Sequence, residues 1–357
     1  MSGATPDLVG ETVSRLLSAV CTFEAIEAAE QNRWAPSIWD PLAEAGFVWV
    51  GVSESTGGSG GSWFDAAAVL RAVGSFAAAV PVAETGVLSG WLLASANMAI
   101  PAGPTSVVPG ERSLRVAGDQ LTGNATVAWG SHASLITGLV SHGGETLIVA
   151  LRPDQVTVSP GANMAGEPRD HVTVDVPIVD VLRAPAPAGV DANALAQRGS
   201  LTRSVMIAGA LQSLCEMVIE YTHGRRQFGK PISAFQAVQH HIVNVAQCAA
   251  RASVAADGAV HAMADCVEHV TEQSTARVAF AVSSARVICD EAARLATRSA
   301  HQAHGAMGVT REYPLHHLTR RLWSWPHEYG TSAEWTRQLG RMVHENGAND
   351  LFSLVVD

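Results

Sequence analysis

Two arginines, a phenylalanine and a glycine follow one another where an apolar helical pattern ends. They are Arg225, Arg226, Phe228 and Gly229, within the segment Tyr221–Gln239. A guanidinium offers a planar fork of N–H donors that matches phosphate oxygens, and glycine allows the backbone to turn tightly. The segment therefore predicts a contact for an anion joined to a flat apolar ring. A cation that only complements the end of a helix is the alternative.

Histidines and cysteines are the other side chains that could bind metal or react. His301 and His304 have a spacing that suits a metal on a helix face, but no carboxylate or cysteine near them in the sequence completes a ligand set. The five cysteines form no C-x-x-C pair, and no G-x-S-x-G motif marks a nucleophilic serine. We expect no metal, and we expect the cysteines to be buried thiols in a reducing compartment.

Composition argues against two classes of partner. The formal net charge of the 357 residues is -10, whereas general nucleic-acid binding needs a basic face that neutralises phosphates. No uninterrupted apolar run reaches the roughly eighteen residues of a membrane span, and the first residues lack the pattern of a secretory signal. We therefore expect a cytoplasmic protein without nucleic-acid partners or a membrane span.

Three stretches of different texture predict an α+β fold that is mostly helical. Residues 1–106 show helical periodicity around a glycine-rich loop at residues 53–62, which predicts an N-terminal helical domain. Residues 107–195 alternate Val and Thr with polar residues and predict five to seven short antiparallel strands in a small β-barrel or sandwich. Residues 196–357 are helical again and predict a C-terminal four-helix bundle.

Three parts of the sequence resemble signatures of the acyl-CoA dehydrogenase family. The segment Tyr221–Gln239 resembles the first C-terminal signature, and His301–Leu315 resembles the second. Asp40–Gly46 together with Glu54–Gly60 resembles the N-terminal pattern. The resemblance implies the family's fold, FAD as cofactor, an acyl-CoA thioester as substrate and an electron-transfer flavoprotein as electron acceptor. It also implies a homo- or hetero-oligomer, either a dimer or a tetramer.

The resemblance assigns roles to individual residues. Arg225 corresponds to the arginine that reaches the pyrophosphate of a cofactor bound mainly by the neighbouring subunit, and Phe228 supplies an apolar face near it. Gln302 and the backbone of Gly305 correspond to contacts with the adenosine half. Gln227, in the first signature, is a further predicted cofactor-binding residue.

The sequence departs from the family at the catalytic base. The resemblance implies a carboxylate that removes the proton next to the thioester, in a Tyr-Glu-Gly-Thr-like loop. This loop falls on residues 328–331, where Gly330 and Thr331 are retained and Thr331 is a predicted cofactor contact, but Tyr329 occupies the usual base position. Glu328, one residue earlier, is the candidate base. In an extended loop a one-residue shift turns a side chain to the opposite face.

Two further departures keep three functions open. The segment Arg198–Arg203, where some family members place the base, has no carboxylate, and Trp129-Gly130-Ser131 is the nearest match to a segment that contacts the flavin ring. The first hypothesis is an acyl-CoA dehydrogenase with Glu328 as base. The second is a subunit without independent catalysis that completes the FAD site of a heteromeric enzyme. The third is a flavin oxidase or monooxygenase on the same fold.

Overall fold

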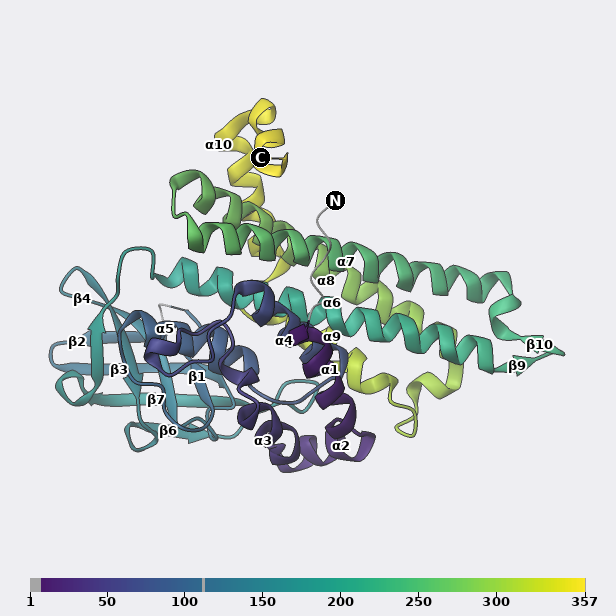
Figure 1. Ribbon diagram of the computed structural model, residues 1–357, viewed down its shortest axis with the longest axis horizontal. Coiled ribbons are helices and arrows are strands. Elements are labelled where there is room, and N and C mark those ends of the chain that lie inside the picture. Colours follow the sequence, from purple (N-terminus) through teal and green to yellow (C-terminus); the bar gives the residue numbers. More distant parts are fainter. Residues whose placement is uncertain (1–7, 111–112, 357) are drawn as a thin grey trace. The chain divides into compact units, whose positions relative to one another are not determined.

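The computed structural model describes residues 8–110 and 113–356, and these residues form two compact units (Figure 1). The first unit runs as far as Val69 and resumes from Ala79 to Gly199, and the second joins Leu70–Ala78 to the residues from Ser200 onward. The division into domains at residues 106 and 195 stays a prediction.

The first unit contains helices and two sheets. Its helices are α1 (Leu8–Val20), α2 (Phe23–Asn32), α3 (Pro36–Glu44), the first part of α4 (Trp63–Ser75), a π-helix (Ala83–Gly90) and α5 (Trp91–Ser95). Thr22 caps α2 by accepting a hydrogen bond from the backbone N–H of Ala25. The glycine-rich loop between α3 and α4 packs on itself, because a Cβ at Gly58 would lie 2.3 Å from the carbonyl oxygen of Val52.

The two sheets of the first unit pack face to face. One has the order β1-β4-β5-β8 and the other β2-β3-β7-β6. Apolar side chains from both, such as Leu121 and Val172 from one sheet and Ile136 and Val149 from the other, share a single buried core. The strands are β1 (Thr105–Val107), β2 (Leu114–Ala117), β3 (Gln120–Ala128), β4 (Leu135–His142), β5 (Glu145–Leu151), β6 (Val156–Ser159), β7 (Arg169–Pro177) and β8 (Leu182–Pro185).

The structure selects the sandwich over the barrel, because neither sheet closes on itself. The prediction of purely antiparallel strands was wrong at β1, which pairs with β4 in parallel, Thr105 opposite Leu135. The described residues contain eight sandwich strands rather than five to seven. β1 and β8 have only 3 and 4 residues, which is too short to show an alternating pattern.

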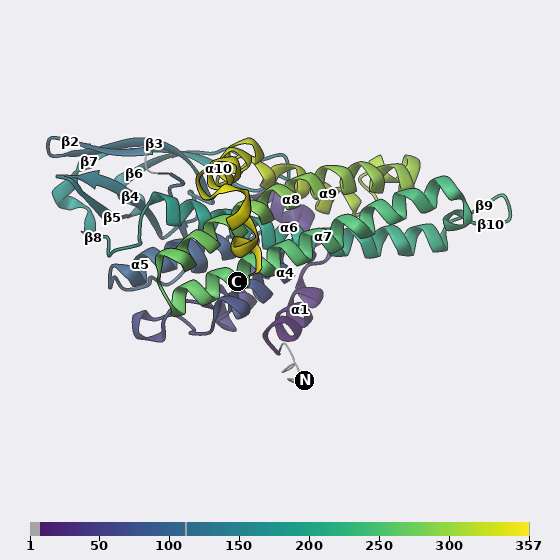
Figure 2. The same ribbon diagram turned by 90° about the horizontal axis from the view of Figure 1, so that it is seen from above.

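The second unit is a bundle of long helices. They are α6 (Ala192–Gly224, whose first turns belong to the first unit), α7 (Gln236–Glu268), α8 (Glu272–His304), α9 (Leu315–Ser324) and α10 (Ser332–Val356). The short strands β9 (Arg226–Gln227) and β10 (Lys230–Pro231) join α6 to α7. Figure 2 shows α6, α7 and α8 extended along one another. The Cys289 thiol on α8 contacts the backbone oxygens of Ser204 on α6 and Ala252 on α7, so α8 lies against both.

Small residues allow this close packing. A Cβ at Gly74 would lie 2.1 Å from the carbonyl oxygen of Met206, and one at Gly209 would lie 2.1 Å from that of Arg71. The end of α4 therefore packs backbone to backbone on α6, which explains why residues 70–78 belong to the second unit. The predicted mostly helical fold with a middle sheet region and a C-terminal bundle is confirmed.

The helical region after the second signature, residues 315–356, is interrupted. The structure has α9 and α10 there, separated by residues 325–331. Pro326 and the positive φ angles of Tyr329 (55°) and Gly330 (99°) explain the interruption, since neither feature fits a helix interior. No helix within the described residues is long and apolar enough to cross a membrane.

Candidate functional site

The cationic segment forms an exposed hairpin at the ends of α6 and α7 (Figure 1). Phe228 and Gly229, with φ angles of 49° and 81°, make the turn between β9 and β10, and Arg226 donates a hydrogen bond to the carbonyl oxygen of Gly229 at 3.1 Å. Phe228 is 91% exposed, and its ring meets Phe235 edge-on. Arg225 and Gln227 are exposed too, so the hairpin presents cations and an aromatic ring outward.

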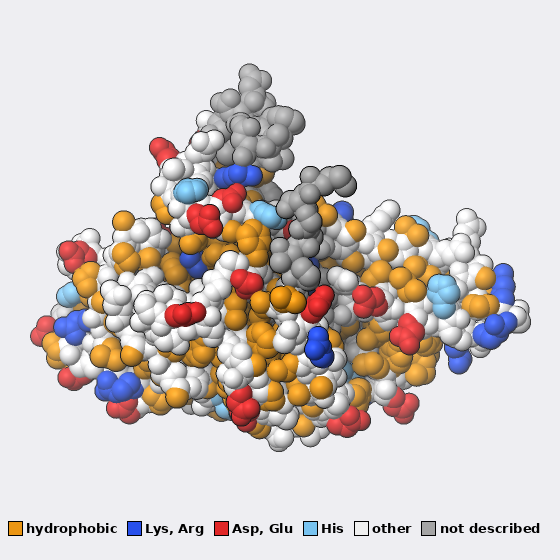
Figure 3. Space-filling model, in the orientation of Figure 1, with side chains coloured by type: hydrophobic (Ala, Val, Ile, Leu, Met, Phe, Trp, Pro, Cys, Tyr) orange, Lys and Arg blue, Asp and Glu red, His pale blue; other side chains and the backbone are white. Residues whose placement is uncertain are grey.

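Figure 3 shows Lys and Arg side chains gathered at this end of the molecule. The exposed cations here are Arg225, Arg226 and Lys230, and the Lys230 ammonium lies 4.3 Å from the centre of the Phe235 ring. The potential at the turn is therefore locally positive in a chain whose formal net charge is -10. This local charge suits a phosphate-bearing ligand.

The structure brings the two C-terminal signatures together through aromatic contacts. The Tyr221 ring stacks on His304 with a centroid distance of 4.3 Å, and the Tyr221 hydroxyl donates to the carbonyl oxygen of His304. His304 uses Nδ1 to donate to the carbonyl oxygen of Ala300, and burial lowers the pKa of His304. Gln302 and Gly305 are exposed beside this contact, and a Cβ at Gly305 would meet nothing within 4 Å.

The metal-like spacing of His301 and His304 has other uses in the structure. The Nε2 atom of His301 lies 3.2 Å from the hydroxyl of Thr319, while the His304 ring packs against both Tyr221 and Tyr313. Both contacts tie the end of α8 to neighbouring segments.

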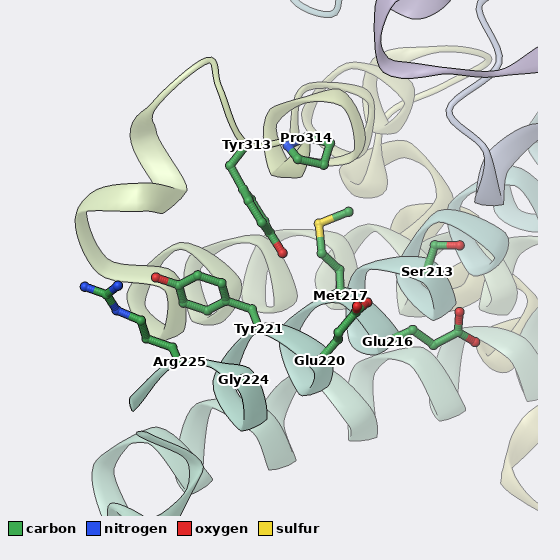
Figure 4. Close-up of a pocket in the computed structure, with 9 residues that line it drawn as sticks. All are labelled: Ser213, Glu216, Met217, Glu220, Tyr221, Gly224, Arg225, Tyr313 and Pro314. Carbon is green, nitrogen blue, oxygen red and sulfur yellow. The ribbon is translucent and has the colours of Figure 1, made fainter. Parts of the chain in front are cut away.

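A pocket of about 730 Å³ lies beside the aromatic contact (Figure 4). Tyr313 and Tyr221 line it together with Glu216, Glu220 and Arg225. Burial and the charge of Glu220 raise the pKa of Tyr313. Glu216 and Glu220 are exposed. They are four residues apart on α6 and therefore lie on the same helix face. This spacing, shortly before Arg225, is the sequence signal that could have predicted that they line one pocket.

Glu328, the candidate base, is held by a buried arginine. Its side chain is 16% exposed, and its Oε2 accepts a hydrogen bond of 2.6 Å from Nε of Arg203, whose side chain is 1% exposed. The same guanidinium lies 5.4 Å from the centre of the Tyr329 ring. Glu328 and Tyr329 therefore both lie near Arg203. The opposite-face geometry of an extended loop does not apply here, because Tyr329 has a left-handed φ angle and the segment is not a regular extended strand.

Arg286 on α8 holds the backbone of the same segment. It is fully buried and donates from Nη2 to the carbonyl oxygens of Trp325 and Glu328, both at 2.9 Å. Its Nε lies 3.2 Å from Asp290. Burial lowers the pKa of Arg286 and raises the pKa of Asp290 to about 6. Sequence reasoning missed this pair, although two charges four residues apart in an alanine-rich helix could have indicated it.

The retained glycine and threonine have structural uses. Gly330 is confined to glycine by its φ angle and by Trp335, whose Nε1 would lie 2.7 Å from an added Cβ. Thr331 caps α10: its N–H and hydroxyl both donate to Oε2 of Glu334, and the N–H of Glu334 donates back to the Thr331 hydroxyl. These hydrogen bonds lower the pKa of Glu334. The cofactor role of Thr331 stays a prediction.

In the first unit, the donors of Ser131 are already used. Its N–H and hydroxyl both donate to Oδ2 of Asp170 at 2.8 Å. Asp170 is fully buried, accepts a third hydrogen bond from the N–H of Gly161, and forms an ion pair with Arg33. The segment that partly matched a flavin-ring contact is thus fastened to a buried carboxylate.

Comparison with known proteins agrees with these features. The acyl-CoA dehydrogenase N-terminal domain model matches residues 5–98, and the acyl-CoA dehydrogenase C-terminal domain model matches residues 192–343. The chain is 28% identical to acyl-CoA dehydrogenase FadE27 of Mycobacterium tuberculosis over 376 aligned positions, covering 97% of this chain and 98% of FadE27. It is 25% identical to acyl-CoA dehydrogenase IpdE2 of Mycolicibacterium smegmatis over 336 positions, covering 93% and 97%.

Solved structures show the same fold. A chain of the ChsE4-ChsE5 complex from Mycobacterium tuberculosis matches with a TM-score of 0.81 at 22% identity, covering 97% of this chain and 99% of that chain. A glutaryl-coenzyme A dehydrogenase matches with a TM-score of 0.76 at 18% identity, covering 97% and 95%. Because the two family models together match more than half of its residues, the chain belongs to the acyl-CoA dehydrogenase family.

Proposed function

We propose that this chain acts in the FAD-dependent α,β-dehydrogenation of an acyl-CoA thioester. The observation that carries the proposal is the exposed hairpin, in which the side chains of Arg225 and Phe228 are exposed, together with the exposed residues Gln302 and Gly305 at the end of α8. A ligand with a pyrophosphate and flat rings matches these groups chemically. The family membership supplies the reaction class.

The exposed residues fit one end of a flavin dinucleotide. Arg225 would hold the pyrophosphate and Phe228 would contact an apolar face, with Gln227 beside them. Gln302 and the backbone of Gly305 would contact the adenosine half, since no side chain occupies the space next to Gly305. The same side chains are available to a cofactor held mainly by a second chain, because the hairpin is exposed in this one.

Glu328 is the proposed base. When bound, FAD would supply the acceptor for the substrate hydride, and an electron-transfer flavoprotein would be the acceptor of its electrons. The proton from the carbon next to the thioester passes to the Glu328 carboxylate, which is only partly exposed to water. Arg203 donates a hydrogen bond to Oε2 of this carboxylate. The proton must therefore bind the other carboxylate oxygen or displace this hydrogen bond.

Purified chain loaded with FAD should reduce an artificial electron acceptor when mixed with acyl-CoA thioesters of several chain lengths. Glu328→Gln should abolish this turnover while flavin absorbance shows that the cofactor stays bound. Glu291→Gln, a change to an exposed carboxylate on α8, is the control. Unchanged turnover in Glu328→Gln would remove Glu328 from the mechanism.

The second candidate is a subunit that completes the FAD site of another chain. Two observations favour it: both donors of Ser131 are used by Asp170, and Glu328 is paired with Arg203. The similarity to a chain of the ChsE4-ChsE5 complex adds support. Under this proposal, Arg225→Ala should lower the flavin content of a co-purified complex, while the lone chain binds little flavin. Full flavin occupancy and turnover by the lone chain would contradict it.

The remaining functional predictions stay open to test. A flavin oxidase or monooxygenase would form a flavin–oxygen adduct in rapid-mixing spectra, whereas a dehydrogenase would not accumulate it. Homo- or hetero-oligomerisation, cytoplasmic location and the three-domain division at residues 106 and 195 also remain proposals. Oligomerisation predicts a dimer or tetramer in sedimentation, and the three-domain division predicts preferential proteolysis near those two boundaries.

A further inference from the structure

We propose that Arg203 and Arg286 are the positioning residues for the segment Trp325–Thr331, which carries the candidate base. Arg203 fixes the carboxylate of Glu328 from α6, and Arg286 fixes the backbone of the segment from α8. The catalytic consequence rests on the proposed function, in which Glu328 receives the substrate proton. The structural part stands without it.

Arg286 is placed to hold backbone rather than a ligand. Its side chain is fully buried, and a buried guanidinium is costly unless carbonyls or carboxylates satisfy its N–H groups. Nη2 donates to the carbonyl oxygens of Trp325 and Glu328 at 2.9 Å and approaches that of Gly330 at 3.5 Å. Three carbonyls of one short segment thus converge on one atom, so movement of the segment away from α8 breaks several contacts at once.

Asp290 fixes Arg286 in turn. Its carboxylate lies one helical turn away on α8, with an oxygen 3.2 Å from Nε, and both side chains are at most 1% exposed. The contact is an ion pair and not a hydrogen bond, because neither Nε of Arg286 nor the Asp290 oxygens have a hydrogen-bond partner among the described residues, and it keeps a compensating charge beside the guanidinium. The backbone between α9 and α10, which has left-handed residues at Tyr329 and Gly330, is therefore fixed by a charged group and not by apolar packing alone.

Arg203 acts on the side chains of the same segment. Nε donates to Glu328 at 2.6 Å, Nη1 contacts the sulfur of Met206 at 3.3 Å, and the guanidinium faces the Tyr329 ring at 5.4 Å. Because Arg203 is on α6 and Arg286 is on α8, the segment is held from two helices. A base held this way has one position, and a misplacement of about 1 Å at a reacting group costs about a hundredfold in rate.

The test compares four variants of the full chain: Arg203→Lys, Arg203→Gln, Arg286→Lys and Arg286→Gln. Arg298→Gln is the matched control, since Arg298 is an exposed arginine on α8. Hydrogen exchange is followed by mass spectrometry in peptides covering residues 325–335 and, as an internal reference, the middle of α7. We expect Arg286→Gln to speed exchange in the first peptide about tenfold or more while exchange in α7 and in the control is unchanged.

Turnover of the FAD-loaded chain is the second readout. Arg203→Gln and Arg286→Gln should lower kcat by about 10- to 100-fold with little change in KM, and the lysine variants, which keep the charge, should recover part of the loss. A purely structural role would lower the amount of active protein without this graded recovery in kcat per bound flavin.

The outcomes separate the inference from the proposed function. Unchanged exchange in residues 325–335 of both glutamine variants overturns the inference, whatever the activity. If Glu328→Gln leaves turnover intact, the proposed base fails, and faster local exchange in Arg286→Gln still supports the positioning of the segment. If Glu328→Gln abolishes turnover but both glutamine variants keep the kcat of the native chain, the inference is overturned while the base is retained.

Discussion

Asp170 is the residue whose replacement tests the first unit most directly. It is fully buried and accepts hydrogen bonds from the N–H and hydroxyl of Ser131, from the N–H of Gly161, and from Arg33. Asp170→Asn removes the charge and replaces one accepting oxygen by an NH₂ group that faces donors. We expect the first unit to lose stability, because no rotamer of the amide satisfies all four donors.

The size of the loss follows from the kinds of bond involved. Hydrogen bonds to a charged group contribute about 1.5–3 kcal/mol each, and a buried donor left without an acceptor costs about 1–3 kcal/mol. The contribution of Arg33 is discounted because its side chain is 29% exposed. We therefore expect a loss of about 3 kcal/mol in the free energy of unfolding, which lowers the transition temperature by about 6–12 °C for a unit of this size.

Urea denaturation and calorimetry of the full chain measure this change. Asp175→Asn is the control, because Asp175 lies on the same strand, β7, with its side chain exposed, and it should change stability by less than about 0.5 kcal/mol. A loss below about 1 kcal/mol for Asp170→Asn, with the fold intact by circular dichroism, would refute the view that Asp170 holds these segments together.

Three further predictions concern the second unit. The pKa of Asp290 is raised to about 6 in the folded chain from an ordinary 3.8, so the folded state binds this proton more tightly than the unfolded state. The contribution of Asp290 to stability therefore increases as pH falls from about 6 towards 4. Asp290→Asn should remove that increase, measured as the urea midpoint at each pH. The lowered pKa of His304 has the opposite effect: the contribution of His304 to stability is lost as pH falls through the ordinary value of 6.5. His304→Asn, whose amide can still donate to the carbonyl oxygen of Ala300, should flatten that decline. Gly330→Ala should cost about 2–3 kcal/mol of unfolding free energy because of its φ angle and the contact with Trp335, whereas Gly340→Ala on α10, with nothing within 4 Å of the new Cβ, should be neutral or slightly stabilising.

The fold was predictable where a pattern continues over many residues. The 3.6-residue periodicity of α6 indicated the bundle, and the Val- and Thr-rich runs in β4, β5 and β7 indicated the sheet region. The short strands β1 and β8 could not be identified, because three or four residues carry too little alternation. The parallel pairing of β1 with β4 depends on the path of the chain between them and has no local signal.

The candidate site was predictable only in part, for a related reason. Arg225 and Phe228 are adjacent in sequence, and their composition alone indicated an exposed contact for an anion and a ring. Arg203, Arg286 and Glu328 come from three separate parts of the chain and meet only through tertiary packing. The sequence did show that the segment Arg198–Arg203 lacks a carboxylate. Its arginine, and not a missing acid, proved to be the residue that reaches Glu328.

The one-residue displacement of the candidate base therefore has a different meaning in three dimensions than in the sequence. On a regular strand, Glu328 and Tyr329 would point to opposite faces, and only one of them could lie near α6. Tyr329 instead adopts a φ angle of 55°. The Arg203 guanidinium lies over the Tyr329 ring and also donates a hydrogen bond to Glu328. The Glu328 carboxylate and the Tyr329 ring thus both lie near Arg203. Under the proposed function, the register of the loop therefore does not exclude Glu328 as the base, because its carboxylate and the Tyr329 ring both lie at Arg203.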